Sequence, residues 1–135
     1  MSETIILDNE NITIRYLPDK KMIYHTVHRP FGGQDLRDAL LTGFDALQEF
    51  GVCKWLSDER KAGPESDEDR EWGEKNLTQR AQEAGWKYWA LVVPTQVAAA
   101  GALVPVINLL FDFGLRMMVF TELDPAFEWL DKFEA

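Results

Sequence analysis

Hydrophobic and polar positions alternate along the first 28 residues, which is the pattern of β-strands that bury one face. The alternating segments cover residues 4–8, 12–17 and 22–28 and are rich in β-branched and aromatic side chains. Polar, turn-forming residues at 8–11 and 18–21 separate these segments. The pattern therefore predicts three antiparallel strands joined by short turns.

Beyond residue 36 the apolar spacing changes to three and four residues, which predicts amphipathic helices. Gly51, Gly85 and Gly114 each follow an expected helix, and Ser66 with Asp69 forms a helix-capping signal. The expected helices cover residues 36–50, 66–84, 95–113 and 124–133, and short apolar strands are expected at 52–56, 88–93 and 116–120. Repeated helix–strand units require right-handed crossovers and a mainly parallel sheet.

These elements predict one α/β domain over residues 1–135, with a mixed sheet and about four helices. The net charge of −9 and the absence of a Lys/Arg cluster argue against nucleic-acid binding. A single cysteine and an amino terminus without a signal-peptide pattern favour the cytoplasm.

The expected helix 95–113 is unusual because it is apolar on all sides. Pro94 separates it from the preceding strand, so no transmembrane span is expected. A helix of this kind must be covered on both sides, by the chain itself, a second copy, another protein or lipid. Contact with a membrane surface therefore stays open. The residues assigned to an interface or a ligand lid are Leu103, Val106, Ile107 and Leu110.

A charged segment follows the expected strand 52–56 and contains Ser57, Asp58 and Arg60. Ligands of α/β proteins bind beyond the carboxyl ends of parallel strands, so these residues form a candidate binding site. The neighbouring strand ends would add Pro94, Thr95 and Thr121. The alternative interpretation is structural: the chain leaves the core after Ser57, and Asp58 organises the loop by accepting backbone N–H groups or pairing with Arg60.

Few other residues carry a chemical signal. His25 and His28 fall on opposite faces of a strand and cannot chelate one metal ion together. The glycines at 32 and 33 precede a helix, where backbone N–H groups could cradle an anion. No nucleophile, base and orienting group can be assembled, so we expect no metal, no cofactor and no enzymatic activity.

Several aromatic and charged segments resemble the bacterial SpoIIAA-like proteins of the STAS/Sec14 type. The similar segments are residues 55–61, 71–72, 84–90, 120 and 126–130. The resemblance implies (βα) units wound as a superhelix around a mixed sheet. It also implies two functional precedents: anti-sigma-factor antagonists with a phosphorylated serine at a strand end, near the position of Ser57, and Sec14-like proteins that hold lipids in an apolar cavity.

The leading hypothesis is a non-enzymatic protein-interaction or regulatory module that acts as a homodimer. The alternative is a carrier of a small apolar ligand or lipid, of the Sec14-like type, in which helix 95–113 serves as a lid.

Overall fold

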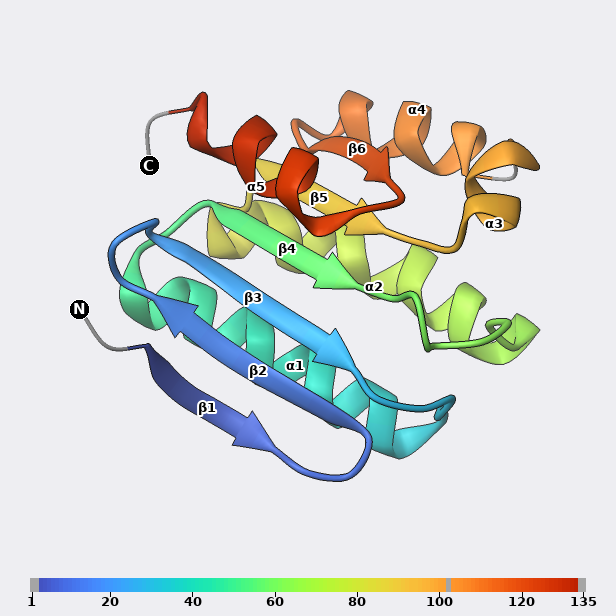
Figure 1. Ribbon diagram of the computed structural model, residues 1–135, viewed down its shortest axis with the longest axis horizontal. Helices are drawn as coiled ribbons and strands as arrows, with labels where there is room; N and C mark the ends of the chain where they lie inside the picture. The colour runs from blue at the N-terminus through green and yellow to red at the C-terminus, as the bar shows by residue number, and fades with distance from the viewer. Residues whose placement is uncertain (1–2, 102, 134–135) are drawn as a thin grey trace.

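The computed structural model describes residues 3–101 and 103–133, apart from the side chains of residues 77 and 78. Its centre is a six-stranded sheet in which the strands lie side by side in chain order (Figure 1). The first three strands are antiparallel, and the last three run parallel to the third. The strands are β1 (Thr4–Asp8), β2 (Ile12–Leu17), β3 (Met22–Val27), β4 (Lys54–Asp58), β5 (Tyr88–Val92) and β6 (Arg116–Phe120).

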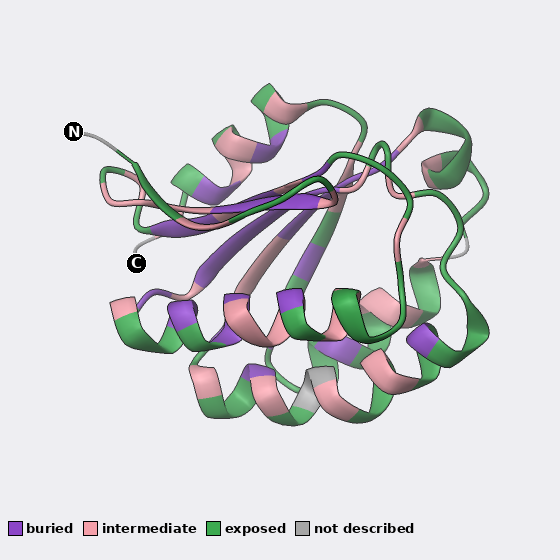
Figure 2. Cartoon of the chain, turned by 90° about the horizontal axis from the view of Figure 1, so that it is seen from below, coloured by how far each residue is buried: buried purple, intermediate pink, exposed green. Residues whose placement is uncertain are grey.

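Helices cover both faces of this sheet. They are α1 (Gln34–Phe50), α2 (Asp67–Ala84), α3 (Thr95–Ala99), α4 (Val104–Asp112) and α5 (Leu123–Asp131). The chain steps from β3 to β6 in one direction through right-handed crossovers, which places the crossover helices on one face. Figure 2 shows α1 and α2 on one side of the sheet and α5 on the other. The mixed α/β architecture predicted from the sequence is confirmed.

The prediction of one helix over residues 95–113 is wrong, because α3 and α4 are separate helices. Gly101 lies between them with a φ of 70°. A continuous helix would place Pro105 in its interior, where the proline ring clashes with the carbonyl of Gly101. Pro105 instead occupies the first turn of α4, where its missing N–H is not needed. No helix in the described ranges is long and apolar enough to cross a membrane.

The face covered by α1 and α2 contains a cluster of aromatic rings. Trp55 lies at its centre, with its ring centroid 5.5 Å from that of Phe44 and 4.9 Å from that of Trp86. Trp86 also contacts Trp89, at 5.0 Å between centroids. Gly43 of α1 lets the helix approach this cluster, since a Cβ at this position would overlap the Trp55 ring.

Among the described elements, α5 is the helix that covers the opposite face. Ala126 and Leu130 of this helix pack on Leu56, Ala90 and Val92 of the two central parallel strands. The two apolar layers together bury the middle of the sheet on both sides, as parallel strands require.

Two glycine-to-alanine changes test the close approach of α1 to the sheet. Alanine is a better helix former than glycine by about 1 kcal/mol. Gly73→Ala in α2, where nothing lies within 4 Å of the added methyl group, should therefore stabilise the protein. Gly43→Ala should instead lower the free energy of unfolding by about 1–3 kcal/mol, because the methyl group displaces Trp55. Urea denaturation of both variants checks this, and equal effects at the two positions would contradict it.

Candidate functional site

Ser57 lies inside the protein, not at the point where the chain enters solvent. Strand β4 continues to Asp58, and Ser57 is only 1% exposed. The indole N–H of Trp89 donates a hydrogen bond to the Ser57 hydroxyl at 2.9 Å, which satisfies the polar group within the core. The backbone leaves the core after Asp58, one residue later than predicted, and the folded chain does not display the Ser57 hydroxyl on its surface.

His25 is the partner of Ser57 on β3 and is also buried, with 2% exposure. Its Nδ1 accepts a hydrogen bond from the indole N–H of Trp55 at 2.9 Å. The proton of the neutral ring is therefore on Nε2, which lies 3.5 Å from a carboxylate oxygen of Glu59. The hydrogen bond to Trp55 joins β3 to β4, while Nε2 has no hydrogen-bond partner among the described residues.

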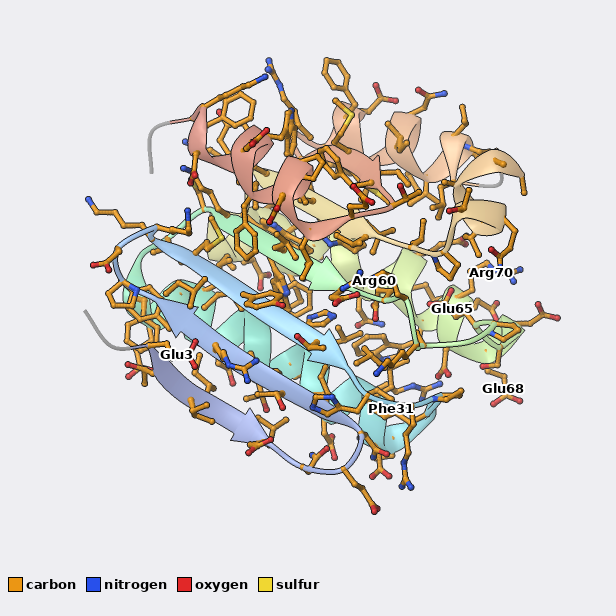
Figure 3. All side chains as sticks on the ribbon, viewed as in Figure 1. Glu3, Phe31, Arg60, Glu65, Glu68 and Arg70 are labelled. Carbon is orange, nitrogen blue, oxygen red and sulfur yellow. The ribbon has the colours of Figure 1, made fainter. Side chains whose placement is uncertain are left out.

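Asp58 points to the opposite face of β4 and pairs with Arg60, as the structural interpretation predicted. The guanidinium donates to both carboxylate oxygens, at 2.9 and 2.8 Å, and the Arg60 backbone N–H donates at 3.3 Å. Burial by itself raises the pKa of Asp58, but the hydrogen bonds and charge of Arg60 outweigh it and hold the pKa below its usual value. Figure 3 shows Arg60 beyond the carboxyl end of β4, on the side where Glu65 and Phe31 lie.

The carboxyl ends of β4, β5 and β6 lie side by side, as predicted from the sequence. The Glu59 N–H donates to the Val92 carbonyl at 2.8 Å, and the Val93 N–H donates to the Phe120 carbonyl at 2.9 Å. Pro94, Thr95 and Thr121 follow directly on these strands, with both threonine side chains exposed. Their role in binding stays a prediction.

The candidate anion cradle before α1 is filled by the chain itself. Both carboxylate oxygens of Asp69 accept the Gly33 N–H at 3.2 Å, and the Arg37 guanidinium lies 3.8 Å away. A Cβ at Gly32 would overlap this carboxylate. The amino terminus of α1 therefore receives a carboxylate from α2 instead of a ligand, and Ser66 caps α2 as predicted.

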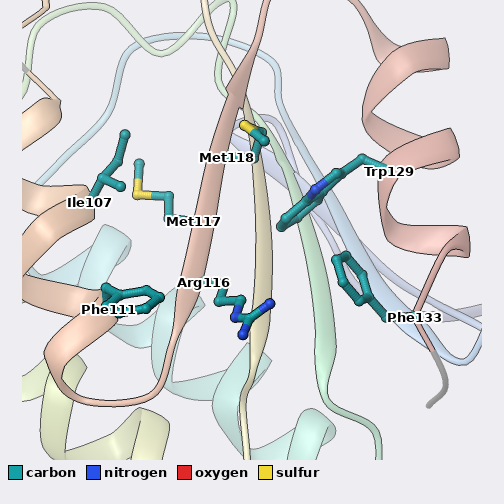
Figure 4. Close-up of a pocket in the computed structure, with 7 residues that line it drawn as sticks. All are labelled: Ile107, Phe111, Arg116, Met117, Met118, Trp129 and Phe133. Carbon is teal, nitrogen blue, oxygen red and sulfur yellow. The ribbon is translucent and has the colours of Figure 1, made fainter.

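An open groove of about 420 Å³ runs along the free edge of β6. Its lining comes from both faces of the sheet: Ile107, Phe111 and Met117 on the α4 side, and Arg116, Met118, Trp129 and Phe133 on the α5 side. In Figure 4 Met117 points toward Ile107, while Met118 points toward Trp129. The groove is therefore bounded by one helix on each side, with the unpaired edge strand between them.

The apolar surface of α4 differs from the one assigned from the sequence. Leu110 is 1% exposed and belongs to the core, so its assignment to an interface or lid is wrong. Leu103, Val106 and Ile107 are half-buried and pack against the same core. These four residues follow a spacing of three and four, so they form one stripe that packs on the sheet. The outward apolar residues are Val104, Leu109, Phe111 and Phe113.

Comparisons with protein families, curated proteins and solved structures find no match to this chain. The candidate site is therefore assigned from its geometry. In the part of the chain that the structure describes, no three His, Cys, Asp or Glu side chains are grouped so as to hold a metal ion. The groove leaves apolar side chains open to solvent, with 61% exposure at Phe111 and 44% at Met118.

Local patterns in the sequence do not mark five of the groove residues as site residues: Phe111, Arg116, Met118, Trp129 and Phe133. A usable signal was the apolar character of residues 116–120 beside the apolar segment 103–111, since an edge strand of a sheet presents unpaired backbone groups.

The Asp58–Arg60 pair predicts how stability depends on pH. A carboxyl group whose pKa is lower in the folded state stabilises the fold above its unfolded pKa of about 4, and this contribution is lost as the pH falls below that value. Arg60→Gln should lower the free energy of unfolding by about 1 kcal/mol at pH 7, and the difference from wild type should shrink below about pH 4. Urea denaturation at several pH values checks this.

Lys61→Gln is the matched control, since Lys61 is an exposed neighbour of Arg60. A loss of stability in Arg60→Gln that stays constant between pH 7 and pH 3 would contradict the assignment.

Proposed function

We propose that this protein is a non-enzymatic interaction module that binds an extended segment of another polypeptide in the groove along β6. The observation that carries the proposal is that the groove draws its lining from both faces of an edge strand. A peptide strand that pairs with β6 would direct alternate side chains to the α4 side and the α5 side, and both sides present apolar side chains. Addition of a strand to a sheet edge is an established mode of peptide recognition.

The buried state of the strand-end residues supports binding over catalysis. Ser57 and His25 are each held by a tryptophan N–H and point into the core. Asp58 is occupied by Arg60. These groups stabilise the end of the sheet, whereas the β6 groove is open to a partner. The resemblance to SpoIIAA-like proteins is consistent with a regulatory role for such binding.

The lipid-carrier hypothesis has less support from the geometry. It needs the segment 95–113 to act as a lid over an apolar ligand. The inward stripe of α4 instead packs on the chain's own core through Leu110 and its half-buried neighbours. A bound lipid would have to use the open groove, where native mass spectrometry would detect it.

Photocrosslinking tests whether the groove contacts another polypeptide. A benzophenone amino acid at Phe111, in the cells that produce the protein, should give a discrete crosslinked species. The same amino acid at Ile5 is the matched control, because Ile5 is half-exposed on β1, at the other edge of the sheet. Absence of a crosslink at Phe111, or the same set of products from both positions, would refute the proposed binding surface.

A further inference from the structure

The backbone of β6 has unused hydrogen-bonding capacity that faces the groove. The Arg116 N–H donates to the Lys87 carbonyl, and the Phe120 carbonyl accepts from the Val93 N–H, each at 2.9 Å. Backbone groups alternate in direction along a strand, so residues 116, 118 and 120 bond to β5, while Met117 and Val119 direct their N–H and C=O groups outward. No strand lies beyond β6 in the described residues.

We propose that the partner in this groove is the β6 strand of a second copy of this chain, paired antiparallel about a two-fold axis at Met118. This inference rests on the proposed function and names the partner. The two sheets would join into one continuous sheet, with the two free edges removed from solvent.

The hydrogen-bonding pattern selects this register. With Met118 opposite Met118 of the second copy, Met117 lies opposite Val119, and each of these two residues has outward N–H and C=O groups. The two symmetric Met117–Val119 pairs then form four hydrogen bonds between the chains. If the pairing were centred on Met117 or Val119, the other of these two residues would find no partner for its outward N–H and C=O groups within residues 116–120 of the second copy.

The side chains fit the same register. Met118, which is exposed in one chain, meets its symmetry copy on the α5 side. A two-fold axis perpendicular to the sheet keeps both α4 helices on one face of the joined sheet. The exposed ring of Phe111, which lines the groove, then lies on the face shared with the second α4, where association removes apolar surface from water.

Charge complementarity favours a second copy over an unrelated strand. Arg116 is the charged residue of the groove lining. In the proposed register Arg116 of one chain lies opposite Phe120 of the second copy. Glu122 follows two residues later on that second copy. The backbone of Glu122 is still extended, with φ −137° and ψ 154°. Diagonal neighbours of an antiparallel pair are about 7–8 Å apart, within reach of Arg and Glu side chains. Symmetry makes two such ion pairs.

Sedimentation velocity of charge-reversal variants tests the pairing. Wild type should sediment as a species of twice the 15.5 kDa chain mass. Arg116→Glu and Glu122→Arg should each raise the dimer dissociation constant by at least about tenfold, because each places like charges together. A mixture of the two single variants should form the heterodimer, since both ion pairs then have opposite signs. Lys61→Glu, with the same charge change elsewhere, should leave the dimer intact.

Val119→Pro provides a second test that does not depend on charge. It removes the outward N–H of Val119, and proline is tolerated at an edge strand whose N–H faces solvent. The variant should retain its circular dichroism spectrum and lose the dimer. A monomeric wild type, or single variants whose mixture fails to associate, would overturn the β6 pairing.

The photocrosslink at Phe111 separates the two proposals. A crosslinked product whose mass is not that of two chains would support the groove as a binding surface but refute a second copy as the partner. A monomer without any crosslink would reject both.

Discussion

The rest of the structure depends on one constraint, the addition of parallel strands in chain order by right-handed crossovers. From β3 to β6 each new strand is placed beside the preceding one, in the same direction. The crossover helices must then share one face, which leaves the other face to α5. Within the described residues, β6 is consequently left with no strand beyond it. The aromatic core around Trp55, the position of α5 and the free edge of β6 therefore all follow from how the sheet is wound.

The polar residues at the strand ends serve this sheet. The indoles of Trp55 and Trp89 provide large apolar surfaces for α1 and α2, and their N–H groups donate to Nδ1 of His25 and to the Ser57 hydroxyl within the core. A buried polar group without such a partner destabilises a protein by about 1–3 kcal/mol. Paired in this way, the same groups fix the register of neighbouring strands. The carboxylate of Asp69 acts similarly between helices, since it binds the amino terminus of α1 from α2.

Local patterns in the sequence predict most of the fold. Alternation of apolar residues indicated the first three strands, and the Ser66 cap with the glycines at 51 and 85 marked the limits of α1 and α2. The pattern did not predict the break between α3 and α4 in residues 95–113, because apolar residues on every side carry no periodic signal. Pro105 was the residue that indicated the start of a new helix. The burial of Ser57 and the lining of the groove depend on contacts between distant segments, such as Trp89 with Ser57 or α4 with β6, which local periodicity does not encode.

Amide hydrogen exchange at β6 tests most directly whether this edge pairs with a second copy. The account predicts that the amides of Met117 and Val119 exchange slowly at high protein concentration and rapidly after dilution, because their protection comes from the other chain. The Met118 amide, which faces β5, should stay protected at both concentrations. Rapid exchange of Met117 and Val119 at every concentration, with Met118 still protected, would contradict the account.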